Sequence, residues 1–168
     1  NFNGSTAQTI PGGAFTNFFR NLSTANSAGV TVGSSGGSTI TILGNLTVTS
    51  GRLNDGGNQI AFGTAGSTLT VGASATLQIG TSSNPTDYPT TNVSTHSLNA
   101  SSTVEYNSIN AQDISNVPTY GNLSLTNSAS TVTKRLMGNT VLNGVLSVAT
   151  NNTLNLRTYD LTINGGTT

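Results

Sequence analysis

The chain has 168 residues, of which 33% are hydrophobic, 5% aromatic and 6% charged, and its five Lys and Arg balance five Asp and Glu. This balance leaves no basic field for nucleic acid, while the lack of Cys and the single His exclude disulfides, thiolate metal sites and His-pair metal sites. No run approaches the about 18 apolar residues of a membrane span, so no transmembrane segment is predicted.

Short stretches in which apolar and polar residues alternate run through the chain. Such alternation predicts half-buried β-strands, and no stretch has the i, i+3, i+4, i+7 spacing of an amphipathic helix. The predicted strands contain, in chain order, Val30/Val32, Ile40/Ile42, Leu46/Val48, Ile60/Phe62, Leu69/Val71, Leu77/Ile79, Leu123/Leu125, Leu146/Val148, Leu154/Leu156 and Leu161/Ile163. Between them lie turn formers such as NDGGN (54–58), where Gly56 and Gly57 are expected to take positive φ.

The spacing of these strands favours an all-β fold of the parallel β-solenoid (β-helix) type, with about three short strands per coil. Ile60 follows Ile40 by 20 residues, and Leu77 follows Leu53 by 24, which is about the length of one coil. Aliphatic side chains would fill a thin core, with Thr, Ser and Asn outside. An antiparallel β-sandwich, with turn signals every roughly 8 to 12 residues, is the alternative.

A long internal repeat divides the chain. NFNGSTAQTI (1–10) aligns with EYNSINAQDI (105–114), which pairs Phe2 with Tyr106, and FRNLSTANSAGVTV (19–32) aligns with YGNLSLTNSASTVT (120–133), which pairs Phe19 with Tyr120. We therefore divide the chain into a complete repeat unit, 1–104, and a second, incomplete copy, 105–168, continuous with the first. The four repeat-matched aromatic residues are predicted to pack at the corners of coils.

The repeat preserves the scaffold and not the charges. Leu154 stands opposite Leu53, whereas Asp113 stands opposite Thr9 and Glu105 opposite Asn1. A catalytic site would concentrate special residues in one place. We therefore do not expect an enzyme, and we predict no catalytic, cofactor-binding or metal-binding residues.

Each motif that could carry chemistry has a structural explanation. GSSGG (33–37) matches the G-x-S-x-G elbow around Ser35, but a predicted strand follows it where a hydrolase needs a helix. Asp55 in NDGGN could bind Ca²⁺, although a tight turn explains the same residues. The single Lys, Lys134, completes no phosphate loop and could form at most one isopeptide link.

The segment 81–102 is the longest stretch without strand alternation, and we predict a polar loop there. It contains Tyr88 and His96, which are possible contacts for a ligand such as a surface glycan.

Three phrases carry a resemblance to a known class of proteins: F-N-G-x-x-A-Q-T-I-P (2–11), F-x-N-L-S-x-x-N-S-A-G-V-T (19–31) and G-N-L-T-V-T-S-G-R-L-N (44–54). They resemble the long repeats of Bacteroidetes-type cell-surface adhesin-like proteins, which are filamentous-haemagglutinin-like chains often exported by type IX secretion. The resemblance implies a secreted repeat protein of β-solenoid architecture that serves adhesion or a surface filament. It supplies no catalytic residues.

The leading hypothesis is thus a non-enzymatic structural segment of an extracellular bacterial surface adhesin or filament, which extends and assembles by β-strand stacking. Its partners would be neighbouring copies of itself or adjoining repeats of a longer chain. A composition rich in Thr, Ser, Asn and Gly and poor in Lys agrees with an extracellular or cell-surface location. The alternative is a carbohydrate- or surface-binding adhesin module that uses the 81–102 loop.

Overall fold

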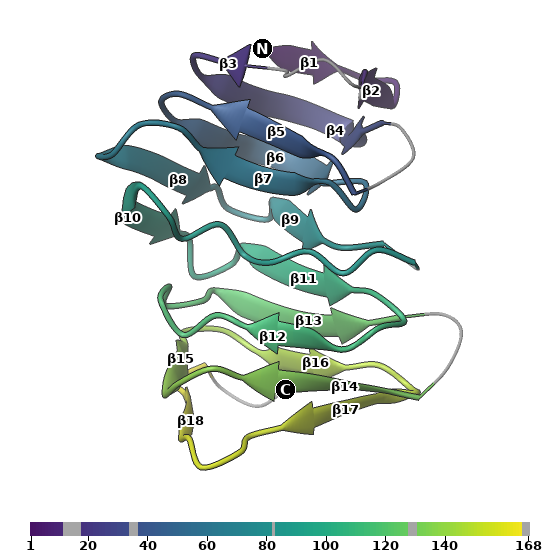
Figure 1. Cartoon of the computed structure of the whole chain (residues 1–168), viewed down its shortest axis with the longest axis vertical. Helices are drawn as coiled ribbons and strands as arrows, with labels where there is room; N and C mark the ends of the chain where they lie inside the picture. The colour runs from purple at the N-terminus through teal and green to yellow at the C-terminus, as the bar shows by residue number, and fades with distance from the viewer. Residues whose placement is uncertain (12–17, 34–36, 82, 128–130, 166–168) are drawn as a thin grey trace.

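The chain folds as a parallel β-solenoid (Figure 1). The computed structural model describes residues 1–11, 18–33, 37–81, 83–127 and 131–165, and these residues form 18 strands and no helix. Every strand pair among them is parallel. The predicted solenoid is therefore confirmed, and the antiparallel sandwich is wrong. None of the described segments is a helix that could cross a membrane.

Three sides make one coil, and each side is a stack of parallel strands. The first side contains β1 (Phe2–Gly4), the leading parts of β4 (Leu22–Val32) and β6 (Leu46–Asn54), β8 (Ser67–Val71) and β10 (Val93–Leu98). The second side contains β2 (Gln8–Ile10), the trailing parts of β4 and β6, β9 (Thr76–Ile79), β11 (Thr103–Asn107), β13 (Asn122–Thr126) and β16 (Leu146–Val148).

The third side is made of two shorter sheets. One holds β3 (Phe18–Phe19), β5 (Thr39–Ile42) and β7 (Gln59–Phe62), and the other holds β12 (Gln112–Ile114), β14 (Val132–Leu136) and β17 (Asn152–Asn155). A final pair, β15 (Thr140–Leu142) and β18 (Leu161–Ile163), takes the place of the first side in the coils that follow β10 (Figure 1).

The second side shows how regular the stack is. Starting from Gln8, six consecutive steps of backbone register lead through Val30, Leu53, Leu77, Val104, Leu123 and Leu146. Each step is one coil, so the chain makes about six turns. Five of the six apolar residues in this row are 0 or 1% exposed, and only Leu146, in the last coil, is half-buried. Burial of each such side chain contributes about 1.5–3 kcal/mol, so a thin core suffices.

Asparagines at corners of the solenoid join successive coils. The Asn21 Oδ1 accepts a hydrogen bond from the Asn45 backbone N–H at 2.8 Å, and the Asn45 Oδ1 accepts one from the Thr68 N–H at 2.9 Å. Asn122 does the same for Val145 at 2.9 Å. Because a corner breaks the strand ladder, these side chains replace backbone acceptors that the turn withdraws.

The turn at 54–58 has the predicted conformation. Gly56 and Gly57 have φ of 63° and 73°, which confirms the positive φ expected from NDGGN. A Cβ at Gly56 would lie 1.8 Å from the Val32 carbonyl oxygen, so glycine is required there for close approach of two coils as well as for backbone conformation.

The segment 81–102 differs from the prediction of a polar loop. Residues Val93–Leu98 form β10, which pairs with β8 and places His96 beside Leu69 and Leu98 beside Val71. The alternation was hidden because a His occupies an inward position that is aliphatic in the neighbouring coil. The prediction of a loop is therefore wrong for these six residues.

The two aligned segments of the chain have matching register. Phe2 pairs with Thr24 as Tyr106 pairs with Leu125, and Phe19 pairs with Ile42 as Tyr120 pairs with Leu142. The division at residue 104 remains a prediction, but the strands on its two sides stack in the same way.

The register also corrects the sequence alignment. Gln8 pairs with Val30 and Gln112 pairs with Lys134, so Val30 corresponds to Lys134, three positions later than the gap-free alignment of the two segments implies. The low-complexity run around LTNSASTVT (125–133) gave the alignment no reason to open a gap.

The second copy begins on a different side of the coil from the first. β1 lies on the first side, whereas β11, which aligns with β1 in sequence, stacks on β9 and so lies on the second side. The 104 residues of the predicted unit therefore correspond to a whole number of turns plus one side.

Candidate functional site

The two predicted ligand contacts, Tyr88 and His96, lie together inside the solenoid. The Tyr88 hydroxyl and the His96 Nδ1 are 3.0 Å apart, and the ring centroids are 5.4 Å apart. Tyr88 is only 3% exposed and His96 is half-buried on β10, facing the same way as buried Leu69. A ligand on the surface would therefore reach little of either ring.

Burial keeps both members of this pair neutral. It lowers the pKa of His96 and, together with the nearby Tyr106, raises the pKa of Tyr88 well above its ordinary value. In a hydrogen bond between a neutral imidazole and a neutral phenol, one group donates and the other accepts, depending on the tautomer of the imidazole. The Nε2 of His96 is buried and has no hydrogen-bond partner among the described residues.

The repeat-matched aromatics occupy different depths in the two aligned segments. Phe2 and Phe19 are half-buried against the core, whereas Tyr106 and Tyr120 are fully buried. The two tyrosine hydroxyls lie 3.1 Å apart, the Tyr120 hydroxyl donates to the Ser115 carbonyl at 2.7 Å, and the Tyr106 hydroxyl accepts from the Ser115 N–H at 3.2 Å. Burial raises the pKa of Tyr106 to about 12 and also raises the pKa of Tyr120 well above its ordinary value.

Two shallow grooves flank the segment 87–91. One, of about 340 Å³, is lined by 59–62 and 87–91, and the other, of about 370 Å³, is lined by Asp87, Tyr88, Thr90, Asp113, 115–117 and Met137. The exposed rim of 87–91 between the grooves, including Asp87 and Thr91, is polar. A ligand bound to the 81–102 segment would therefore contact this rim.

A buried carboxylate, whose bonds to the next coil the sequence did not predict, joins two successive coils. The Asp55 carboxylate accepts hydrogen bonds from the Gly57 N–H at 2.8 Å, from the Gly80 N–H at 3.0 Å and from the Thr86 hydroxyl. Burial raises its pKa, and these hydrogen bonds oppose the rise. Asp55 is 2% exposed, so the oxygens that the Ca²⁺ alternative needs are already engaged in the turn.

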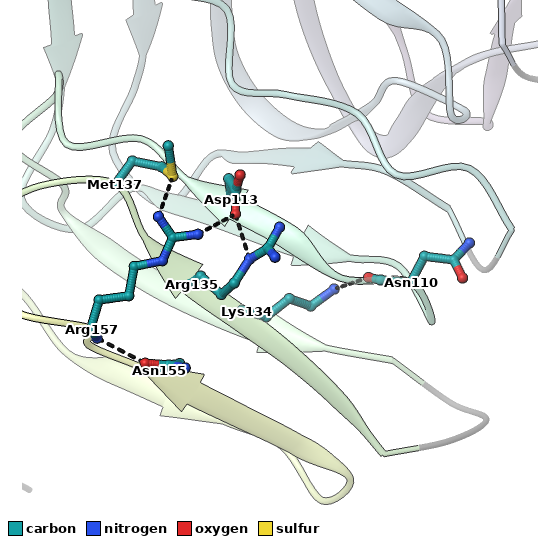
Figure 2. A network of polar contacts seen from close by, with 7 residues as sticks. All are labelled: Asn110, Asp113, Lys134, Arg135, Met137, Asn155 and Arg157. Carbon is teal, nitrogen blue, oxygen red and sulfur yellow. Dashed lines mark hydrogen bonds and ion pairs between the residues drawn. The ribbon is translucent and has the colours of Figure 1, made fainter.

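Lys134 is the least expected residue of the interior. It is 0% exposed, and its Nζ donates to the Ser108 carbonyl at 2.6 Å, to the Gln112 Oε1 at 2.6 Å and to the Asn110 carbonyl at 3.4 Å. Figure 2 shows the last of these three contacts. Burial lowers the pKa of its amine to about 8. The Gln112 amide nitrogen in turn donates to the carbonyls of Ile79 and Thr86, both at 3.2 Å.

Ion pairs on the outside join coils that are far apart in sequence. The Asp113 carboxylate lies 2.7 Å from the Arg135 Nε and 3.8 Å from an Arg157 nitrogen, and another Arg157 nitrogen lies 3.4 Å from the Met137 sulfur (Figure 2). Arg52 pairs with Glu105 at 3.2 Å. These charges stand on different coils and meet across the stack, which spacing along the sequence could not show.

The buried polar side chains described above thus form hydrogen bonds within the solenoid. The described residues contain no group of three or more His, Asp or Glu side chains that could hold a metal ion. Ser35 lies outside the described residues. Comparison of the chain with protein-family models, with curated proteins and with solved structures finds no match.

Proposed function

We propose that the chain is a non-enzymatic structural segment of an extracellular bacterial surface adhesin or filament. The observation that carries the proposal is the unbroken row of backbone register on the second side, from Gln8 to Leu146. At about 4.8 Å per coil, six steps of stacking extend the chain by roughly 29 Å. A stack of this kind gives the chain length.

The interior contacts support the same role. Asp55, Gln112 and Lys134 each bond to a neighbouring coil, and Tyr106 and Tyr120 bond to each other and to Ser115. Groups that are engaged in this way hold coils together and are not available to a substrate.

Labelling of intact cells tests the location and role. Antibodies against the purified chain should bind the surface of unpermeabilised cells that produce it, and immunogold should place the label on surface fibres or on the outer envelope. Label that appears only after permeabilisation would contradict the proposal.

The alternative function, a carbohydrate- or surface-binding module, is favoured by the two grooves beside 87–91. A glycan array is the test. Selective binding that is lost in Asp87→Asn and Thr91→Ala, but kept in the control Thr153→Ala on exposed β17, would support the module. Tyr88→Phe and His96→Gln should act only indirectly, since both side chains face inward.

A further inference from the structure

The last coil leaves its inward face uncovered in the described residues. Val148 on β16 is 42% exposed and Ile163 on β18 is 44% exposed, while Leu146, Leu154 and Leu161 are half-buried. Within the described ranges, each of β16, β17 and β18 is paired on one edge only, with β13, β14 and β15 respectively. We call this surface, formed by these five side chains and the three open strand edges, the terminal face.

The first part of the chain contains the same surface in a covered state. When the two copies of the repeat are aligned by their strand pairing, the five side chains of the terminal face correspond to residues of β6 and β7 in the first copy. These residues are Leu46, Val48, Leu53, Ile60 and Phe62. All five are 0 to 3% exposed. The cover over β6 is the next coil, in which Leu69 and Val71 of β8 pair with Leu46 and Val48, and Leu77 of β9 pairs with Leu53.

We propose that the terminal face binds a further parallel β-coil with the pattern of residues 67–79: Leu-x-Val on one strand and, after a tight turn, Leu on the next. This inference rests on the proposed structural function and names the chemistry of the partner. The partner contributes aliphatic side chains at three fixed positions and two strand edges, one for β16 and one for β17, and it needs no charge.

The first coil of a second copy fits this surface less well. Continuation of the second-side row would place Gln8 over Leu146, because Gln8 begins the row that ends at Leu146. An amide in that position would lose solvation against an apolar face without gaining an acceptor. A coil that carries Leu, as β9 does with Leu77, avoids this cost.

Extension of the chain tests the inference. Residues 64–81 are appended after Asn164, the position that corresponds to Gly63, and hydrogen exchange of the amides in β16 and β17, which correspond to the two parts of β6 and its cover by β8 and β9, is compared with that of the original chain. We expect exchange to slow by about tenfold or more in these strands, with no change in β4 and β6, which serve as the internal reference for folding.

Two control variants make the result specific. In one, the appended Leu, Val and Leu are replaced by Ser, and in the other, Val148 of the receiving face is changed by Val148→Asp. Because Val148 is already exposed, Val148→Asp should leave the original chain folded, and both changes should cancel the slowing in the extended chain.

Two outcomes would overturn the inference. One is unchanged exchange in β16 and β17 of the extended chain while β4 and β6 remain protected. The other is self-association of the unextended chain in sedimentation at about 100 μM, a concentration at which weak complexes form, that Val148→Asp abolishes, since a second copy would then be the occupant. Neither outcome bears on cell-surface labelling, so the proposed function would stand or fall separately.

Discussion

The loop between β1 and β2 and the loop between β11 and β12 align in sequence, yet different side chains hold them. In the first, the Asn26 Nδ2 donates to the Thr6 carbonyl at 2.7 Å and to the Gln8 Oε1 at 3.0 Å. In the second, the Lys134 Nζ donates to the carbonyl groups of the corresponding loop and to Gln112. The comparison teaches that the loop requires a donor from the next coil, and that the position and charge of this donor are free to vary.

The two loops differ in how deeply the residues that accept these hydrogen bonds are buried. Thr6 is exposed and Gln8 is half-buried, so water can replace the Asn26 amide, whereas Ser108 and Gln112 are 0 and 3% exposed. The second loop therefore depends more strongly on its donor. The following predictions use this difference, from the largest expected effect to the smallest.

Lys134→Met should break the second loop. The substitution keeps the length of the side chain but leaves the Ser108 carbonyl and the Gln112 Oε1 without their donor, which should lower the free energy of unfolding by about 3 kcal/mol. Urea denaturation measures this loss. Arg135→Met, at the neighbouring outward position, is the control and should cost about 0.5 kcal/mol, because its ion pair with Asp113 is partly exposed. Equal losses in the two variants would contradict the role assigned to Lys134.

The same lysine should make stability depend on pH. Its pKa is about 8 in the folded chain and 10.5 when exposed, so between these values the unfolded chain binds more protons. The free energy of unfolding should therefore rise as the pH increases from about 8 to 10.5, and Lys134→Met should lack this rise. Denaturation at several pH values checks the slope, and a fall specific to the unmodified chain would refute it.

Asn26→Leu should weaken the first loop by a smaller amount. It removes the two bonds to the loop and the acceptor of the Ala28 N–H, but water reaches the freed groups, so we expect a loss of about 1.5 kcal/mol. Thermal or urea unfolding gives the value. A loss as large as that of Lys134→Met would show that exposure of the loop does not decide the cost.

Tyr106→Phe makes the second segment resemble the first, where Phe2 stands. The variant loses the contact with the Tyr120 hydroxyl and the bond from the Ser115 N–H, which should cost about 1 kcal/mol. Tyr159→Phe, at a half-buried position in the last coil, is the control and should leave the unfolding midpoint unchanged. The prediction would fail if both variants behaved alike.

The sequence was sufficient to predict the repeating part of the fold. Alternation of residues such as Leu46 and Val48, with a spacing of 20 to 24 residues between strands, predicted the coil because both follow from the pleat and from three short sides per turn. The turn at Gly56 and Gly57 was predictable for a similarly local reason.

The interior polar contacts could not be predicted in this way. Lys134 and Asp55 carry no pattern that separates a buried donor or acceptor from a solvated one, since their partners come from other coils. His96 takes an inward place in a strand where periodicity expects an aliphatic residue, so β10 was missed. Tyr88 and His96 were predicted to act together, and they do lie together, but in contact with the core.

The shift of β11 to the second side has a consequence for how a long chain of such units would present its surface. Each unit would start one third of a revolution further around the axis than the unit before it. Loops at equivalent places, such as the 87–91 rim, would then point in three directions in turn, and every third unit along the chain would have the same orientation. A fibre built this way would offer the same groove to its surroundings on all sides.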